Sequence, residues 1–160
     1  MTVRPYDGQE ANAARTPLEG GLLGWAAVLV LGACVVCVRV GPRPLAPVVL
    51  RFARLWIGGL LCFFGGVHRG ASFYNPKGPQ LSDPSVFLAM HFLGLGIVAL
   101  PPRTAWRLAA PGMLATLASD LYLARAGRLP RFFLRLRPLQ LLVAACLAGL
   151  LGSAARARSG

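Results

Sequence analysis

Four side chains in this sequence could carry chemistry in an apolar setting, and they are His68, Arg69, His91 and Asp120. Two histidines can ligate a haem iron, with Arg69 near the haem propionates. The same groups could form a quinone-binding or proton-transfer site, because ionisable residues within a membrane mark such sites. In the plainer interpretation, His68 lies at the membrane interface and His91 forms a hydrogen bond to a neighbouring helix. We expect no cofactor, with haem as the alternative.

Asp120 is the one acid inside the apolar segments of the chain. An ionised carboxylate in hydrocarbon is costly unless it lies near an interface or pairs with a cation. The candidate partners are Arg125, which lies five residues further along, and Arg69, if it falls on the same side of the membrane. We therefore predict a structural ion pair at Asp120, with a proton relay as the alternative.

Motifs of soluble enzymes are missing from the sequence. It has no Ser-His-Asp spacing, no pair of carboxylates, no phosphate-binding loop and no H-E-x-x-H. Cys34-x-x-Cys37 resembles half of a metal or redox site, but it lies in an apolar run and no second pair completes it. The sequence thus predicts a protein that is not an enzyme and holds no metal.

The composition is apolar and strongly basic. Of 160 residues 56% are hydrophobic, and 17 Lys and Arg face 5 Asp and Glu, for a formal net charge of +12. A basic patch can indicate nucleic acid, but here the arginines separate apolar runs instead of lining one face. We therefore expect anionic lipid headgroups, and no nucleic acid, as the partners of these arginines.

The apolar runs predict the helices that must position these residues. A transmembrane helix needs about 20 mostly apolar residues, and Gly41-Pro42, Pro101-Pro102 and Gly127 mark helix ends between the runs. The expected fold is an all-α polytopic transmembrane helix bundle of about five spans, at residues 20–40, 47–73, 84–100, 104–126 and 131–152. Residues 1–19 are expected to be a polar tail, 20–153 the bundle and 154–160 a short basic tail.

Prolines in the last two predicted helices indicate bends, and arginines between these helices form a basic cluster. Pro111 predicts a kink in the fourth span. The alternating "RFFLRLR" of residues 131–137 predicts an interfacial turn, and Pro138 allows a bend before the final span. The basic cluster around this turn is expected to contact anionic lipid such as cardiolipin. Its members are Arg125, Arg128, Arg131, Arg135 and Arg137.

Small residues recur every four positions along the second span, at Gly58, Cys62, Gly66 and Gly70. Small residues at this spacing let two membrane helices approach closely. The pattern therefore predicts a face of the helix against which another helix packs. The numbers of basic residues on the two sides of the membrane are nearly equal, so the positive-inside rule does not choose an orientation.

Two segments resemble a known family. "FFGGVHRGASF" is similar to the "FLGGIHWG" signature of the small multi-pass inner-membrane proteins of unknown function that include transmembrane protein 69, found in bacteria and mitochondria. "LPRFFLRLRPLQLLV" resembles that family's "LPxWYLRLRxxLTxLV", and Asp120 matches its upstream acid. Arg69, Phe132 and Phe133 differ from the Trp, Trp and Tyr of the pattern. The resemblance implies an inner membrane, mitochondrial in preference to bacterial.

These features predict a non-catalytic accessory or structural subunit of a larger inner-membrane complex, respiratory or otherwise energy-transducing. Its partners would be other integral membrane subunits, packed on the Gly58 to Gly70 face, and anionic phospholipids. One alternative is a cofactor-binding, quinone-binding or small transport protein that uses His68 and His91. Another is an assembly factor for a membrane complex.

Overall fold

Five long helices and one 3₁₀ turn make up the part of the chain that the computed structural model describes, residues 18–73, 80–129 and 131–158. No strand occurs among these residues. The predicted all-α helix bundle is therefore confirmed. The elements are α2 (Leu18–Val40), η1 (Arg43–Leu45), α3 (Ala46–Ser72), α4 (Ser82–Ala99), α5 (Pro102–Arg125) and α6 (Arg131–Ala157).

The helices end where glycine and proline were expected to end them. The Gly41 N–H donates to the carbonyl oxygen of Cys37 at 2.9 Å, and Pro42 has no N–H with which to extend α2. Leu100 turns to an extended conformation (φ −70°, ψ 159°), as a residue before proline prefers. Gly127 closes α5 with a φ of 70°, a left-handed value that glycine adopts without strain.

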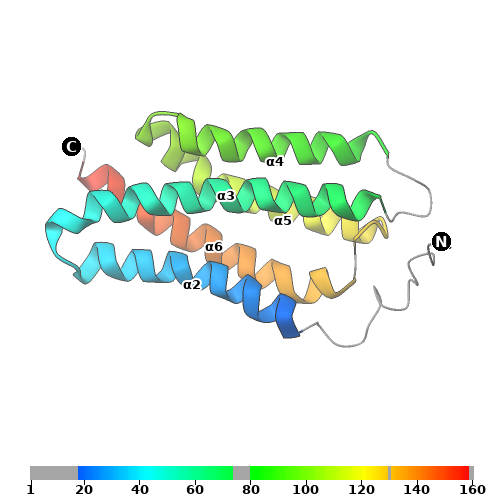
Figure 1. Cartoon of the computed structure of the whole chain (residues 1–160), viewed down its shortest axis with the longest axis horizontal. Coiled ribbons are helices and arrows are strands. Elements are labelled where there is room, and N and C mark those ends of the chain that lie inside the picture. The colour runs from blue at the N-terminus through cyan, green and yellow to red at the C-terminus, as the bar shows by residue number, and fades with distance from the viewer. Residues whose placement is uncertain (1–17, 74–79, 130, 159–160) are drawn as a thin grey trace, which may run out of the picture.

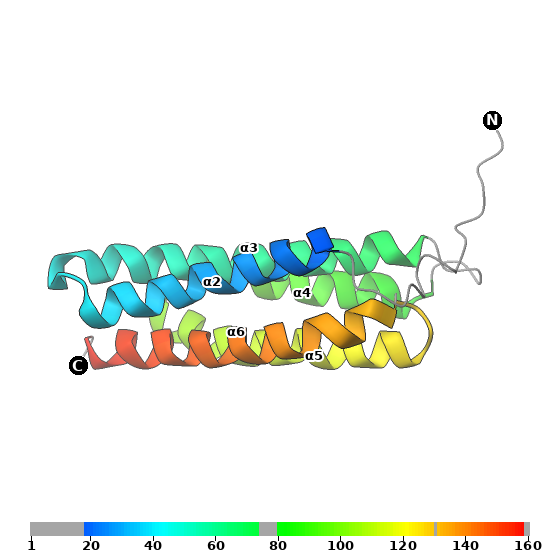
Figure 2. The same cartoon turned by 90° about the horizontal axis from the view of Figure 1, so that it is seen from below.

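The five helices lie side by side along one long axis and alternate in direction (Figure 1, Figure 2). α2 contacts α3 and α6, α4 lies between α3 and α5, and α5 pairs closely with α6. α3 contacts each of the other four helices, so it is the centre of the bundle. α2 and α6 run in the same direction along the bundle, and α6 ends near the side where α2 also ends (Figure 2).

Four of the helices are long and apolar enough to cross a membrane. These segments are Gly21–Val40, Arg43–Ser72, Ser82–Ala99 and Phe132–Ala157. α5 does not meet this standard because it carries Arg103, Arg107, Asp120 and Arg125. Its 24 residues nevertheless extend over about 36 Å alongside α6. The protein is thus an integral membrane protein. Of the five spans expected, four are long and apolar enough to cross a membrane.

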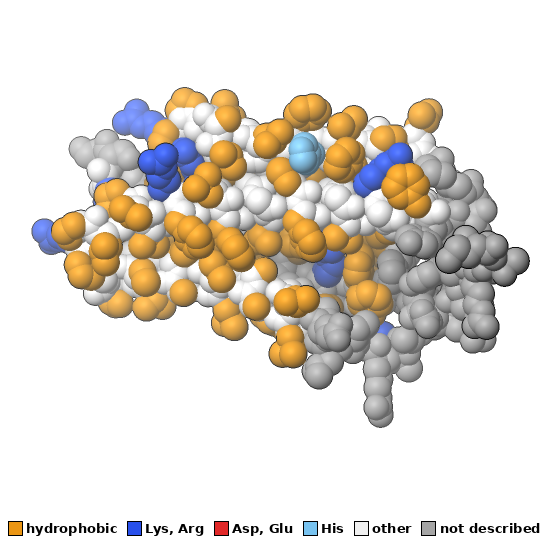
Figure 3. Space-filling view, viewed as in Figure 1, with side chains coloured by type: hydrophobic (Ala, Val, Ile, Leu, Met, Phe, Trp, Pro, Cys, Tyr) orange, Lys and Arg blue, Asp and Glu red, His pale blue; other side chains and the backbone are white. Residues whose placement is uncertain are grey.

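Apolar side chains cover much of the outer surface, as a bilayer requires (Figure 3). Leu23, Leu29 and Val40 of α2 expose 73%, 68% and 80% of their surface. The interior is filled by other apolar side chains, of which Leu31, Ile57, Leu61, Ile97, Met113 and Leu151 are fully buried. A polar contact joins α3 to α2, where the Trp56 indole N–H donates to the carbonyl oxygen of Ala27 at 3.0 Å.

Two sequence expectations about the last helix differ from the structure. Residues 131–137 are the first turns of α6 rather than a separate interfacial turn, and the helix continues through Pro138 to Ala157, into the expected basic tail. α5 also runs through Pro111 as one helix, and the kink expected there stays a prediction. A proline removes one backbone hydrogen bond, and packing against neighbouring helices can hold the helix together around it. Of the predicted polar tail at residues 1–19, residues 1–17 lie outside the described part of the chain and residues 18–19 belong to α2.

Candidate functional site

A buried polar cluster lies at the end of the bundle where α3 and α5 finish and α6 begins. Its members are His68 of α3, Asp120 of α5, and Arg137 and Gln140 of α6. These residues expose only 2%, 2%, 7% and 7% of their surface. Polar groups at such depth need partners, since burying an unpaired charge is costly.

Asp120 is the centre of the cluster. One carboxylate oxygen, Oδ1, is hydrogen-bonded to Nε2 of His68. The other, Oδ2, lies 2.6 Å from Nε of Arg137. A single carboxylate therefore joins three helices, α3, α5 and α6, through charge-assisted contacts, which are stronger than neutral hydrogen bonds.

Two aromatic rings lie against Arg137, and the backbone of α2 lies against Gln140. The guanidinium carbon of Arg137 lies 4.4 Å from the centre of the Phe64 ring and 4.9 Å from that of Phe133, within the range of cation–π attraction. One turn further along α6, the Gln140 amide lies against Gly24 of α2, where a Cβ atom would be only 2.6 Å from Nε2. The cluster is thus closed by apolar rings and by backbone.

Not every donor in the cluster has an acceptor. Nη2 of Arg137 and Nε2 of Gln140 are buried donors without an acceptor among the described residues, and Nδ1 of His68 is buried there without a partner. Chemically, the arrangement can hold the three helices together, and it can hold a proton between His68 and Asp120.

The predicted ion pair at Asp120 is present, but its partner is not one of the two candidates. Arg125 is exposed, because five residues correspond to a turn of about 140° around the helix. Arg69 points its guanidinium at the Phe73 ring, 4.4 Å from the ring centre. The partner is Arg137, which was expected at the lipid headgroups. Its presence inside an apolar segment, on the same helix face as Gln140, was the signal that sequence reasoning missed.

The two histidines have different neighbours. His68 faces Asp120 in the interior, whereas the ring of His91 is half buried with its centre 5.5 Å from that of Phe87. Within the described ranges, no group of three or more His, Cys, Asp or Glu could hold a metal ion. The expected grouping of His68, Arg69, His91 and Asp120 is therefore reduced to one pair, His68 with Asp120.

The predicted packing stripe is correct for its first half only. A Cβ atom on Gly58 would lie 2.7 Å from the carbonyl oxygen of Gly94, so the backbones of α3 and α4 almost touch there. Cys62 continues this contact, with its Sγ 3.5 Å from the carbonyl oxygen of His91. Gly66 and Gly70, in contrast, are exposed and would have no atom within 4 Å of an added Cβ.

Helix geometry explains the difference. Each step of four residues turns about 40° beyond a full circle, so that Gly70 lies about 120° away from Gly58. A step of seven residues comes within about 20° of two full turns, so the two residues lie on nearly the same side of the helix. Gly65, seven residues after Gly58, does face α4, where an added Cβ would lie 3.0 Å from the carbonyl oxygen of Phe87. The contact face is thus Gly58, Cys62 and Gly65, with Gly94 opposite.

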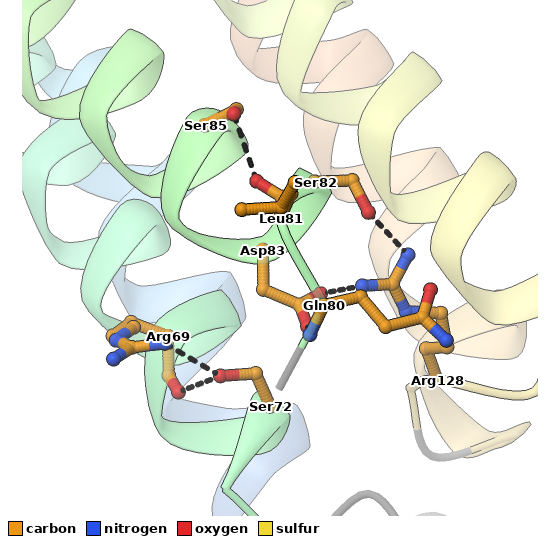
Figure 4. A network of polar contacts seen from close by, with 8 residues as sticks. All are labelled: Arg69, Ser72, Gln80, Leu81, Ser82, Asp83, Ser85 and Arg128. Atoms are coloured by element: carbon orange, nitrogen blue, oxygen red, sulfur yellow. Dashed lines mark hydrogen bonds and ion pairs between the residues drawn. The ribbon is translucent and has the colours of Figure 1, made fainter. Parts of the chain in front are cut away.

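A second ionic contact closes the same end of the bundle. Arg128, in the turn after α5, forms an ion pair with Asp83 at the start of α4 and donates to Ser82 Oγ at 2.7 Å (Figure 4). Asp83 is 4% exposed and also accepts the Gln80 N–H at 2.8 Å. Arg128 therefore joins α4 to the α5–α6 connection and is not a free headgroup-binding residue.

The remaining arginines of the expected headgroup cluster differ in placement. Arg125 and Arg135 have exposed side chains, which is compatible with headgroup contact. The side chain of Arg131 lies outside the described part of the chain. Of the five arginines, two are thus engaged with buried carboxylates, and the predicted lipid cluster is smaller than the sequence suggested.

We expect Arg128→Gln to lower the free energy of unfolding by about 1.5 kcal/mol, because the buried Asp83 would lose its cation. The measurement is unfolding by a denaturing detergent, followed by tryptophan fluorescence. Arg125→Gln, which removes an exposed arginine only three positions earlier, is the matched control and should change the stability by less than about 0.5 kcal/mol. Equal losses in the two variants would contradict a role for the Arg128–Asp83 pair.

Comparison of the chain with models of protein families, with curated proteins and with solved structures gave no match.

Proposed function

We propose that this integral membrane protein is a non-catalytic accessory subunit of a larger inner-membrane complex, respiratory or otherwise energy-transducing. One observation carries the proposal. Both acids whose side chains are described, Asp83 and Asp120, are buried and paired with arginines of the same chain. The described carboxylates, which could have served a reaction, thus join helices instead, and this supports a structural role.

The partners in this proposal are other integral membrane subunits. The Gly58 side of α3 is already occupied by α4, so it is not available to them. Gly66 and Gly70 are exposed on another side of α3 and leave open space. Small residues allow a close approach of helices, so this outer side of α3 is the contact that we propose for a helix of another subunit.

The membrane in this proposal is the mitochondrial inner membrane, with a bacterial inner membrane as the alternative. Support comes from the resemblance of residues 63–73 and 129–143 to the family that includes transmembrane protein 69. The exposed Arg125 and Arg135 are suited to anionic headgroups of such a membrane.

We expect the protein, purified from its native membrane in a mild detergent, to migrate with a complex much larger than itself. Gly66→Leu with Gly70→Leu should release it from that complex by filling the open space, while the bundle stays folded. Native gel electrophoresis with identification of the co-migrating proteins is the measurement. Migration of the unaltered protein by itself would refute the proposal. An assembly factor would instead accompany incomplete complexes and be absent from mature ones.

A second candidate function is a polar-ligand, proton-transfer or small transport site at His68. The buried pair of His68 and Asp120, each only 2% exposed, favours it. A Soret band in the visible spectrum of the purified protein would identify haem. Proton flux into liposomes that contain the protein, abolished by His68→Phe, would identify proton transfer. Neither signal is expected from a structural subunit.

A further inference from the structure

A pocket lies at the end of the bundle opposite the His68 cluster. Its volume is about 340 Å³, and it is formed where α3 and α5 begin and α6 ends. Its walls include the apolar side chains of Leu50 and Trp106. Three arginines line it as well, Arg51 and Arg54 of α3 and Arg158 at the end of the described chain.

Neutral acceptors hold two of these arginines in place. Arg54 donates to the carbonyl oxygens of Val98 and Leu100, each at 3.3 Å, at the end of α4. Arg158 donates to the carbonyl oxygen of Val38 at 3.1 Å, near the end of α2. Carbonyl oxygens orient a guanidinium and suit the negative end of a helix dipole, but they leave the full positive charge of each arginine in the pocket.

No carboxylate described in the structure compensates for these charges. Asp83 and Asp120, the acids with described side chains, are paired at the opposite end of the bundle. Nε of Arg54 is buried and has no acceptor among the residues that the structure describes. The pocket thus combines three cations, an unpartnered buried donor and an apolar wall, a combination suited to a ligand with an anionic head and an apolar tail.

The depth of the arginines indicates which ligand reaches them. Arg51 and Arg54 lie five and eight residues after Ala46, the first residue of α3. At 1.5 Å per residue they are about 8 and 12 Å along the helix. For a helix that begins at the outer edge of a headgroup layer about 5 to 8 Å thick, these positions are at and just inside the boundary with the acyl chains. A phospholipid in the adjacent leaflet would bring its phosphate to this level.

We propose that this pocket binds an acidic phospholipid of the surrounding bilayer. Its phosphate is held by Arg51, Arg54 and Arg158, whose planar guanidinium groups match phosphate oxygens. The first part of an acyl chain lies against Leu50 and Trp106. The site is separate from the exposed arginines at the other end and is independent of the proposed function.

The test is native mass spectrometry of the full-length protein in detergent, with phosphatidylglycerol, phosphatidylcholine or inorganic phosphate added. We expect one phosphatidylglycerol to bind in preference to phosphatidylcholine. Arg51 is exposed and forms no hydrogen bond with its side chain in the described part of the chain, and Arg51→Gln should weaken this binding about fivefold. Arg51→Lys, which keeps the charge, should restore most of it. Arg103→Gln, on an exposed arginine at the same end but outside the pocket, is the control and should leave binding unchanged.

Three outcomes would overturn the proposal. Equal binding of the two lipids would show that charge does not select the ligand. Equal losses for Arg51→Gln and Arg103→Gln would show that only the overall charge of this end matters. Displacement of the lipid by millimolar inorganic phosphate would assign the arginines to a free anion. Unchanged helix content of each variant, measured by circular dichroism, ensures that unfolding is not the cause of any loss.

Discussion

Asp120→Asn is expected to lower the free energy of unfolding by about 4 kcal/mol, because it leaves Arg137 as a buried cation without a counter-charge. Arg137 is only 7% exposed and lies between two aromatic rings, so it cannot reach water without moving α6. The side chain of asparagine keeps the shape of aspartate, and the loss would therefore report the charge and not the packing. Unfolding by a denaturing detergent, followed by tryptophan fluorescence, measures the effect.

A double-mutant cycle with Arg137→Gln separates the ion pair from its surroundings. Because each single variant leaves one charge unpaired and the double variant leaves none, the double variant should be more stable than the sum of the two losses predicts, by more than about 1.5 kcal/mol. Arg125→Gln is the control for removal of an arginine. A loss below about 0.5 kcal/mol for Asp120→Asn would show that the cluster does not stabilise the bundle.

Gly58→Leu is expected to lower the free energy of unfolding by about 3 kcal/mol, at the upper end of the cost of overpacking. Its first added carbon alone would lie 2.6 Å from Cγ2 of Val98 and 2.7 Å from the carbonyl oxygen of Gly94. The valine side chain can turn aside, but the backbone oxygen cannot, so α3 and α4 would have to separate. The same denaturation experiment measures this.

Gly66→Leu is the matched control, because it makes the same change on the same helix. Nothing lies within 4 Å of an added Cβ at Gly66, and leucine favours a helix over glycine by up to about 1 kcal/mol. We expect the stability to be unchanged or slightly raised in the isolated protein. If the two variants lost equal stability, the close contact between α3 and α4 would be refuted.

Sequence reasoning located the helices to within a few residues. The expected spans at residues 47–73, 84–100 and 104–126 correspond to α3 at Ala46–Ser72, α4 at Ser82–Ala99 and α5 at Pro102–Arg125. Such agreement is possible because the information is local. An apolar run of sufficient length forms a helix in a membrane wherever its neighbours lie, and proline and glycine end helices through their own backbone properties.

The roles of individual side chains were less predictable. Arg137 was assigned to the headgroups from its place in "RFFLRLR", and Arg128 was assigned there with it. Both pair with buried carboxylates on other helices. The sequence shows that an arginine lies near a helix end, but which way it points depends on the rotation of that helix against its neighbours.

By itself, the sequence determined that this chain is an all-α membrane protein, where most of its helices begin and end, and that Asp120 needs a cation. The tertiary structure decided that the cation is Arg137, that His68 shares the carboxylate, and that Gly58 faces α4 while Gly66 does not. The reason is that length and hydropathy are properties of one segment. A contact between side chains involves two helices, and it depends on the rotation of each helix about its own axis.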